Sequence, residues 1–176
     1  MKINWIYLFI LAFLGSCKSI PNNVEIANQF VEAFYSFDSI RLSSILTKAN
    51  QSKLGILYYQ KWAECGNYKI MKKNDFIEKN DSTILCPITV KDDLIGALNI
   101  DFYVTDTFHL HINKGQIRYM RTSSNDPDIY HKAKEWVIKN YPELIEESCN
   151  GIWAPCECVK AMIKGYAQFL SAENQK

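Results

Sequence analysis

Ten consecutive apolar residues, 5–14, stand close behind the positively charged Lys2 in this chain of 176 residues. A membrane-spanning helix needs roughly 20 apolar residues, so this run is too short to be a stable anchor. A short apolar run behind a positive charge is typical of the central region of a secretory signal peptide. We therefore expect residues 1–16 to be an export signal.

Apolar residues recur with the period of a helix between residues 24 and 64. The spacing i, i+3, i+4, i+7 predicts an amphipathic helix over residues 24–37, which Asn22 or Asn23 can cap. A shorter helix is expected around residues 42–46, and a third over residues 52–64, which Gly66 ends. The expected inward positions are Ala27, Phe30, Val31 and Phe34, then Leu42, Ile45 and Leu46, then Leu54, Leu57, Tyr58 and Trp62.

Beyond Gly66 the period changes to two, which predicts strands. Residues 67–79 indicate a broken edge strand. Residues 83–90 predict a better defined strand, whose apolar face carries Ile84, Cys86, Ile88 and Val90. Pro87 indicates a bulge or an edge position there, because proline has no N–H for the ladder. Residues 92–98 predict a helical turn with acids at its positive N-terminal end.

A β-hairpin is the clearest element of the chain. Its first strand alternates Phe108, Leu110 and Ile112 with Thr107, His109 and His111, and Lys114-Gly115 provides the turn. A two-residue loop pairs Ile112 with Ile117 and Leu110 with Tyr119, apolar against apolar. A three-residue loop would instead oppose them to Gln116 and Arg118. Because the buried face sets the register, we expect the two-residue loop.

A pair of helices is predicted to close the chain. Asp126-Pro127 is a cap followed by proline at the first helical position, and Tyr141-Pro142 ends the first helix. The second is expected over residues 157–172. Their apolar positions are Ile129, Ala133, Trp136 and Val137, then Val159, Met162, Ile163, Tyr166 and Leu170. These stripes are too apolar to face water, so we expect both helices to complete the core of one domain over residues 24–176.

The charge balance restricts the partners. Removing residues 1–16 takes away one lysine and no acid, so the 20 basic and 19 acidic residues become 19 and 19. A neutral surface argues against nucleic acid, whose binding requires a basic face. The chain also lacks a P-loop, a dinucleotide fingerprint and a nucleophile elbow. We therefore expect no cofactor.

Five cysteines remain when Cys17 is set aside, namely Cys65, Cys86, Cys149, Cys156 and Cys158. Cys149, Cys156 and Cys158 are close enough in sequence to form a disulfide, which export would permit. An odd number implies at least one free thiol or an intermolecular bridge. Free thiols are the second alternative, and a zinc site is the third, because no histidine lies near these cysteines and the CxxC spacing is absent.

The segment Leu14-Gly15-Ser16-Cys17 resembles the lipobox of bacterial lipoproteins. The resemblance implies that Cys17 becomes the lipidated first residue of the mature protein and that residues 17–23 are a tether. Two or three acyl chains hold a protein at a membrane, whereas one binds reversibly. The residue after Cys17 is Lys18 and not Asp, and in this the chain resembles lipoproteins that are sent to an outer membrane. We expect the domain to lie on the periplasmic side of that membrane. The alternative is an ordinary signal peptide with a chance cysteine.

The order of elements resembles the nuclear transport factor 2-like superfamily, which includes ketosteroid isomerases and polyketide cyclases. Three segments carry the resemblance: residues 84–98, the hairpin residues 108–117, and residues 136–143. It implies an α+β fold, with a cone-shaped curved antiparallel sheet packed against N-terminal helices and an added C-terminal helix pair. The cone of that fold is the usual ligand cavity. Its expected wall residues here are Tyr58, Trp62, Phe102, Phe108 and Tyr119.

Two small constellations could carry chemistry. His109 and His111 share a strand face, and with a carboxylate they could bind a metal. Arg118 on the same face across the hairpin would repel a cation, however. We therefore expect this face to point outward and to contact solvent or a second copy in a homodimer. Asp101, Tyr103 and Asp106 lie near the sheet rim. One carboxylate inside the cone would act as a general base, whereas solvated rim residues would have no catalytic role.

These observations favour a lipid-anchored, non-catalytic domain that binds a small apolar ligand or a partner protein. The alternative is a lyase or isomerase of the ketosteroid isomerase type, which uses a carboxylate in the cone. The two hypotheses differ in one structural feature. The enzyme requires an ionisable side chain buried within reach of a tyrosine.

Overall fold

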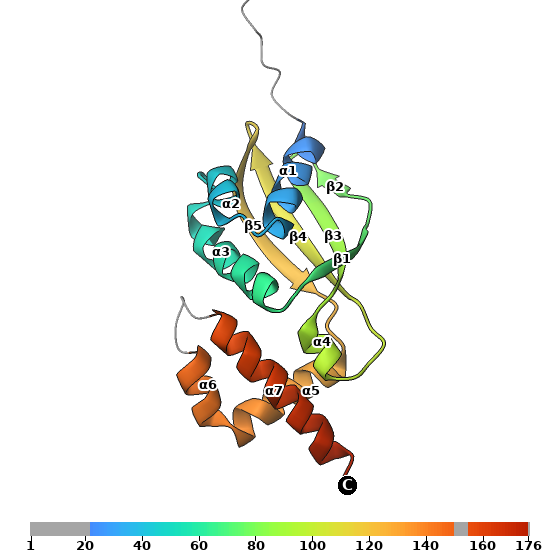
Figure 1. Ribbon diagram of the computed structural model, residues 1–176. Helices are drawn as coiled ribbons and strands as arrows, with labels where there is room; N and C mark the ends of the chain where they lie inside the picture. Colours follow the sequence, from blue (N-terminus) through green and yellow to red (C-terminus); the bar gives the residue numbers. More distant parts are fainter. Residues whose placement is uncertain (1–21, 150–154, 176) are drawn as a thin grey trace, which may run out of the picture.

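The computed structural model describes residues 22–149 and 155–175 (Figure 1). The expected signal peptide, Cys17 and most of the expected tether lie outside these residues. None of the helices within the described part of the chain is long and apolar enough to span a membrane. The fold is α+β, with helices and an antiparallel sheet of five strands.

Three N-terminal helices form as predicted: α1 (Asn23–Tyr35), α2 (Ser39–Ile45) and α3 (Asn50–Cys65). The Asn22 side chain caps α1 by accepting a hydrogen bond of 2.7 Å from the Glu25 N–H, and Asp38 caps α2 in the same way. Ala27, Phe30, Val31 and Phe34 of α1 are all buried, as expected.

The buried face of α3 differs from the prediction. Its fully inward positions are Ile56, Gln60 and Ala63, whereas Leu54 is 63% exposed. Gln60 causes the difference, because its side-chain amide donates hydrogen bonds of 2.9 and 3.0 Å to the carbonyl oxygens of Ala33 and Phe34 at the end of α1. These carbonyls belong to the last turn of α1, where the regular N–H partners are missing, and Gln60 adds to the bonds that they accept from the Ser36 hydroxyl and the Phe37 N–H. A polar side chain therefore takes an inward position.

The sheet has the order β1-β3-β4-β5, from β1 (Lys69–Lys73), β3 (Thr83–Lys91), β4 (Val104–Asn113) and β5 (Gln116–Ser124). The short β2 (Ile77–Asn80) also pairs with β3, so the predicted broken edge strand is confirmed. Pro87 lies opposite the break, where its carbonyl accepts a hydrogen bond of 3.1 Å from the Asn74 N–H. The edge is thus interrupted where β3 has no N–H to offer. The predicted helical turn is α4 (Asp93–Ala97).

The hairpin between β4 and β5 has the predicted two-residue turn, since Asn113 pairs with Gln116 and Ile112 with Ile117. The register then shifts, and Leu110 lies opposite Met120 instead of Tyr119. The extra residue in β5 places Met120 in the core and leaves Tyr119 45% exposed. The prediction that Tyr119 is buried is therefore wrong.

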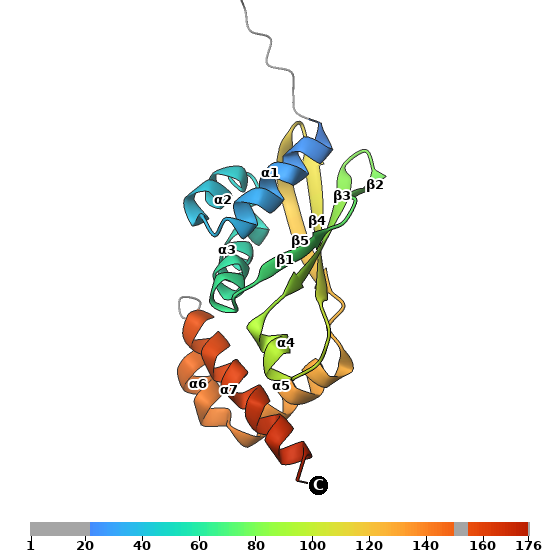
Figure 2. The ribbon, with the colours of Figure 1, turned by 45° about the vertical axis from the view of Figure 1, so that its right-hand side comes forward.

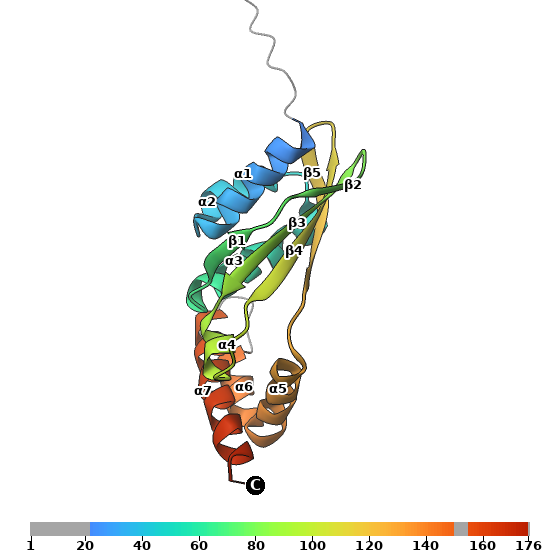
Figure 3. The same cartoon turned by 90° about the vertical axis from the view of Figure 1, so that its right-hand side faces the viewer.

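Helices α1, α2 and α3 cover one face of the twisted sheet, and none of the helices in the described residues lies on the opposite face (Figure 3). Aromatic rings fill the space between these helices and the sheet. The Phe108 ring lies 4.8 Å from that of Phe34, 5.2 Å from that of Phe30 and 6.3 Å from that of Tyr59, between ring centroids. We call this the aromatic layer.

The C-terminal segment forms α5 (Asp128–Asn140), α6 (Pro142–Cys149) and α7 (Pro155–Glu173), so three helices replace the predicted pair. Pro142 ends α5 as expected, but it also begins α6, at the first helical position that proline tolerates. These helices lie beyond the end of the sheet (Figure 2). Helix α7 packs against α3, α4, α5 and α6, with Val159, Met162 and Tyr166 buried.

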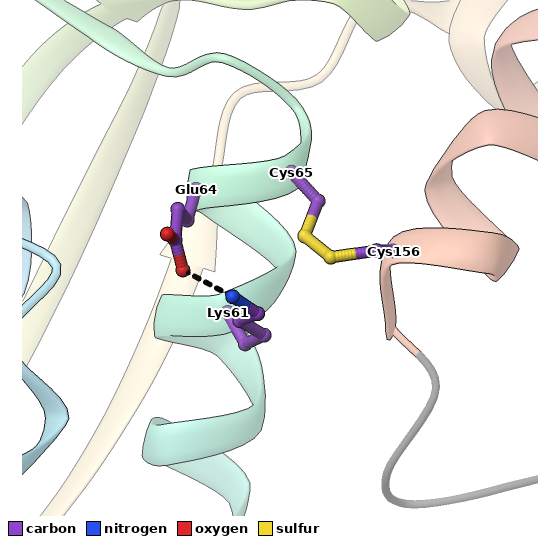
Figure 4. Close-up of a disulfide and its surroundings, with 4 residues drawn as sticks. All are labelled: Lys61, Glu64, Cys65 and Cys156. Carbon is purple, nitrogen blue, oxygen red and sulfur yellow. Dashed lines mark hydrogen bonds and ion pairs between the residues drawn. A yellow bond between two sulfur atoms is a disulfide. The ribbon is translucent and has the colours of Figure 1, made fainter.

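Two disulfides connect α7 to other helices. Cys65 at the end of α3 bonds to Cys156 at the start of α7, with a Cα–Cα distance of 5.0 Å (Figure 4). Cys149 at the end of α6 bonds to Cys158, with a Cα–Cα distance of 4.5 Å. Cys86 is a buried free thiol. Cys65 was outside the predicted set, because its partner is 91 residues away in sequence.

Candidate functional site

The residues that the sequence suggested for a site lie in several different places. Phe108 belongs to the aromatic layer and is fully buried, while Tyr119 is exposed on β5. Asp101 and Tyr103 are exposed and Phe102 is half-buried, all between α4 and β4. Tyr58, Trp62 and Asp106 each line a cavity or groove, and only Trp62 and Asp106 line the same one.

Asp106 is a buried carboxylate on β4. Its side chain points to the same face as Val104 and Phe108, because alternate residues of this strand are buried. Only 3% of Asp106 is exposed. The Tyr59 hydroxyl donates a hydrogen bond of 2.6 Å to its Oδ2. A buried acid within reach of a tyrosine is the feature that separates the two functional hypotheses.

A cavity of about 290 Å³ opens beside Asp106 at the junction between the sheet and the C-terminal helices. Two stretches of the chain that are distant in sequence contribute to its wall: residues 59–68, from α3 and the segment after it, and residues 106–130, from β4, β5 and the chain into α5. The lining residues are Tyr59, Trp62, Tyr68, Asp106, Thr122, Ser123, Ser124, Asp126 and Tyr130. We call this the Asp106 cavity.

Burial dominates the electrostatics of the Asp106 cavity. It raises the pKa of the Asp106 carboxyl from 3.8 to about 6, against the lowering effect of the Tyr59 hydrogen bond. Burial likewise raises the pKa of Asp92 to about 6, and Asp92 caps α4 by accepting a hydrogen bond of 2.9 Å from the Ile95 N–H. Asp126 contributes a further raising effect on both carboxyls.

The tyrosines around the cavity stay protonated at neutral pH. Burial, with the nearby carboxylates, raises the pKa of Tyr59 and of Tyr68 well above 10 and that of Tyr130 to about 12. Their hydroxyls are therefore neutral hydrogen-bonding groups. Among the described residues, no Lys, Arg or His lines this cavity or forms an ion pair with Asp106.

A second, apolar depression of about 560 Å³ lies on the outer side of α2 and α3. Tyr58 lines it, together with Ile40, which is 83% exposed, and Leu54. Pro155 at the start of α7 and the stem of Lys61 complete one side. This apolar groove lacks a buried charged group, in contrast to the Asp106 cavity.

The two strand histidines lie outside both hollows. His109 is half-buried, and its Nε2 lies 2.9 Å from the Ser123 hydroxyl, while His111 is exposed. The cation opposite His109 is Arg121 and not Arg118, because of the register shift in β5. Within the described residues, no group of three or more His, Cys, Asp or Glu side chains could hold a metal ion.

Sequence reasoning identified two residues of the Asp106 cavity, Trp62 and Asp106, and missed most of the others. Tyr59 follows Tyr58 directly, but the expected α3 stripe placed it off the inward face. Tyr68 and Tyr130 come from segments that meet only in the folded chain. The Asp126-Pro127 pattern predicted a cap followed by proline at the first helical position, and this prediction is wrong, because α5 begins at Asp128 with Pro127 at the cap position and no side-chain cap hydrogen bond. Asp126 lines the cavity instead.

None of the protein-family models, curated proteins or solved structures compared with this chain matches it.

Proposed function

We propose that this chain is an exported lipoprotein, anchored through a lipid on Cys17 to the periplasmic side of an outer membrane, whose domain binds a small ligand without transforming it. The apolar run and the lipobox-like segment at 14–17 support export. The two disulfides support it independently, because disulfides persist in oxidising compartments.

The proposal includes membership of the nuclear transport factor 2-like superfamily. Three N-terminal helices, an antiparallel sheet and a glycine hairpin in this order support the resemblance. In this chain, however, aromatic rings occupy the space beneath the N-terminal helices. We therefore place the ligand at the end of the sheet, in the Asp106 cavity, and expect a polar ligand there in place of an apolar one.

One observation carries the choice of this site. A carboxylate that is 3% exposed lies beside a cavity without a cationic side chain to compensate its charge. A buried charge without a counter-ion destabilises a fold by several kcal/mol, or the pKa of the group shifts towards its neutral form. Such an arrangement is typical of functional sites, where binding compensates the instability.

Native mass spectrometry of the protein purified from its own membrane tests this proposal. We expect a retained small molecule, whose occupancy falls in the Asp106→Asn variant and is unchanged in Asp101→Asn, which removes an exposed acid outside the cavity. Equal occupancy in both variants would place the ligand elsewhere. A protein that never carries or captures a small molecule would contradict the proposed function.

A lyase or isomerase is the second candidate, favoured by the 2.6 Å hydrogen bond between Tyr59 and Asp106. A carboxylate with a pKa of about 6 suits a general base at neutral pH. It would take a proton from a carbon next to a carbonyl group and return it to another carbon. The Tyr59 hydroxyl already donates its hydrogen bond to the Asp106 carboxylate, however. This tyrosine is therefore not a free donor for an enolate oxygen.

Deuterium exchange separates the second candidate from the first. An isomerase would incorporate solvent deuterium next to the carbonyl of a β,γ-unsaturated ketone, and Asp106→Asn would abolish that incorporation. A binding protein would show none above the uncatalysed rate. Tyr59→Phe is the matched variant, because it removes the hydroxyl and preserves the ring.

A further inference from the structure

We propose that the Asp106 cavity binds a small organic cation, an alkylated or quaternary ammonium group held between carboxylates and aromatic rings. This inference rests on the proposed binding function and specifies the chemical class of the ligand. Its basis is the composition of the cavity wall, in which two carboxylates and four aromatic side chains meet without a basic residue among the described ones.

The charges of the wall select the sign of the ligand. Asp106 and Asp126 line the cavity directly, and Asp92 acts on both Asp106 and Tyr68 electrostatically. An anion would meet repulsion from all three carboxylates. A neutral ligand would leave the buried Asp106 charge unpaired. A cation alone supplies the missing partner, and in a partly desolvated site its interaction with a carboxylate is stronger than in water.

The aromatic residues select an organic cation over a metal ion. Tyr59, Trp62, Tyr68 and Tyr130 surround the carboxylates, and aromatic faces attract ammonium groups, with Trp the strongest partner. A divalent metal would need a compact set of oxygen or nitrogen ligands, and no such set occurs among the described residues. Thr122 on β5 also lines the cavity, and its hydroxyl suits a polar substituent on the ligand, whereas the Ser123 and Ser124 hydroxyls already bond to His109 and Asp126.

The size of the cavity restricts the ligand further. Pockets for drug-sized ligands span about 300–1,000 Å³, and the Asp106 cavity, at about 290 Å³, lies at the lower limit. It is therefore large enough to hold a single small headgroup. The polar wall around that headgroup also distinguishes this site from the apolar groove on α2 and α3.

Isothermal titration calorimetry on the purified full chain tests the inference with two probes of the same shape. One is choline, and the other is its uncharged isostere, in which a tert-butyl group replaces the trimethylammonium group. We expect choline to bind at least about tenfold more tightly, a difference of about 1.4 kcal/mol. Asp106→Asn should reduce this preference several-fold, because Asp126 remains in the wall, and Asp101→Asn should preserve it, with circular dichroism checking that both variants fold.

Each other outcome overturns the inference in a recognisable way. Equal affinity for the two probes would show that charge at this cavity does not select the ligand, and a preference undiminished in Asp106→Asn would show that the Asp106 carboxylate does not contribute to it. If choline fails to bind while native mass spectrometry detects a retained neutral or anionic molecule, the ligand class is wrong and the binding function stands. If neither experiment detects a ligand, both proposals are wrong.

Discussion

The aromatic layer and the Asp106 cavity are adjacent along β4 but opposite in character. Phe108, fully buried, packs in the layer among apolar rings, whereas Asp106, two residues earlier on the same face, is buried beside a hollow. The layer gains stability from close packing and dispersion. The junction holds a desolvated charge that a stable fold would avoid. The contrast shows that packing alone explains the first region, and it supports our proposal that the second is a binding site.

The disulfide between Cys65 and Cys156 joins α3, which contributes Tyr59 to both regions, to the C-terminal helix α7, and its removal should have the largest effect. The loop it closes spans 91 residues, for which chain entropy gives about 4–5 kcal/mol. We expect the double variant Cys65→Ser/Cys156→Ser to lose that much unfolding free energy in urea. The matched variant Cys149→Ser/Cys158→Ser opens a loop of nine residues and should lose about 3 kcal/mol. The reverse order would contradict the described connection.

Phe108→Ala tests the aromatic layer itself. Removing a fully buried ring should lower the free energy of unfolding by about 3–5 kcal/mol. Tyr119→Ala, on the neighbouring strand and exposed, should change it by less than about 0.5 kcal/mol. Comparable losses for both variants would show that the register shift in β5 is misplaced.

Asp106→Asn should raise the free energy of unfolding, whereas the variants above lower it, because the buried Asp106 charge is unfavourable to the fold. The folded-state pKa of Asp106, about 6, exceeds the usual 3.8, so folding favours the protonated form. The contribution of Asp106 to stability is therefore most favourable below pH 4 and becomes less favourable as the pH rises towards 6. Two pKa units correspond to about 3 kcal/mol, and the loss of the carboxylate bond to Tyr59 offsets part of it.

We therefore expect Asp106→Asn to raise the free energy of unfolding at pH 8 by about 1–3 kcal/mol and to have little effect near pH 4. Urea denaturation at both pH values measures the difference, with Asp101→Asn as the control that should change neither. Asp92, with its own raised pKa, will keep part of the pH dependence in the variant. A loss of stability at pH 8 would instead mean that the carboxylate supports the fold through Tyr59.

The smallest effect is expected at Leu54, which lines the apolar groove on α2 and α3. Because Leu54 is 63% exposed, Leu54→Ser should change the free energy of unfolding by less than about 0.5 kcal/mol. Ile56→Ala, on the buried face, should lower it by about 2–5 kcal/mol. Thermal melts of the two variants compare the faces directly.

Much of the fold was predictable because local patterns determine it. The Asn22 cap, the alternation in β3, the two-residue hairpin turn and the acidic start of α4 each depend on neighbours in sequence. The errors arise where tertiary contacts override the local pattern. Gln60 takes an inward position because the end of α1 needs hydrogen-bond donors, and a single bulge in β5 exchanges Tyr119 for Met120.

The candidate site was less predictable, since its wall is assembled from distant segments. The pattern of β4 allowed Asp106 to be considered as an acid inside the fold, but nothing local indicated that Tyr59, Tyr68 and Tyr130 surround it. The Cys65–Cys156 disulfide has the same origin, because residues 91 positions apart meet only through the packing of α3 on α7.

The titration of Asp106 tests the central claim most directly. Carbon-detected NMR of the side-chain carboxyls can follow this residue through the pH range, with Asp106→Asn identifying its signal. We expect a pKa of about 6 in the free protein and a lower value with saturating choline, because a bound cation stabilises the ionised form. A pKa near 3.8 without ligand, or one that choline leaves unchanged, would contradict the account of the Asp106 cavity as a cation site.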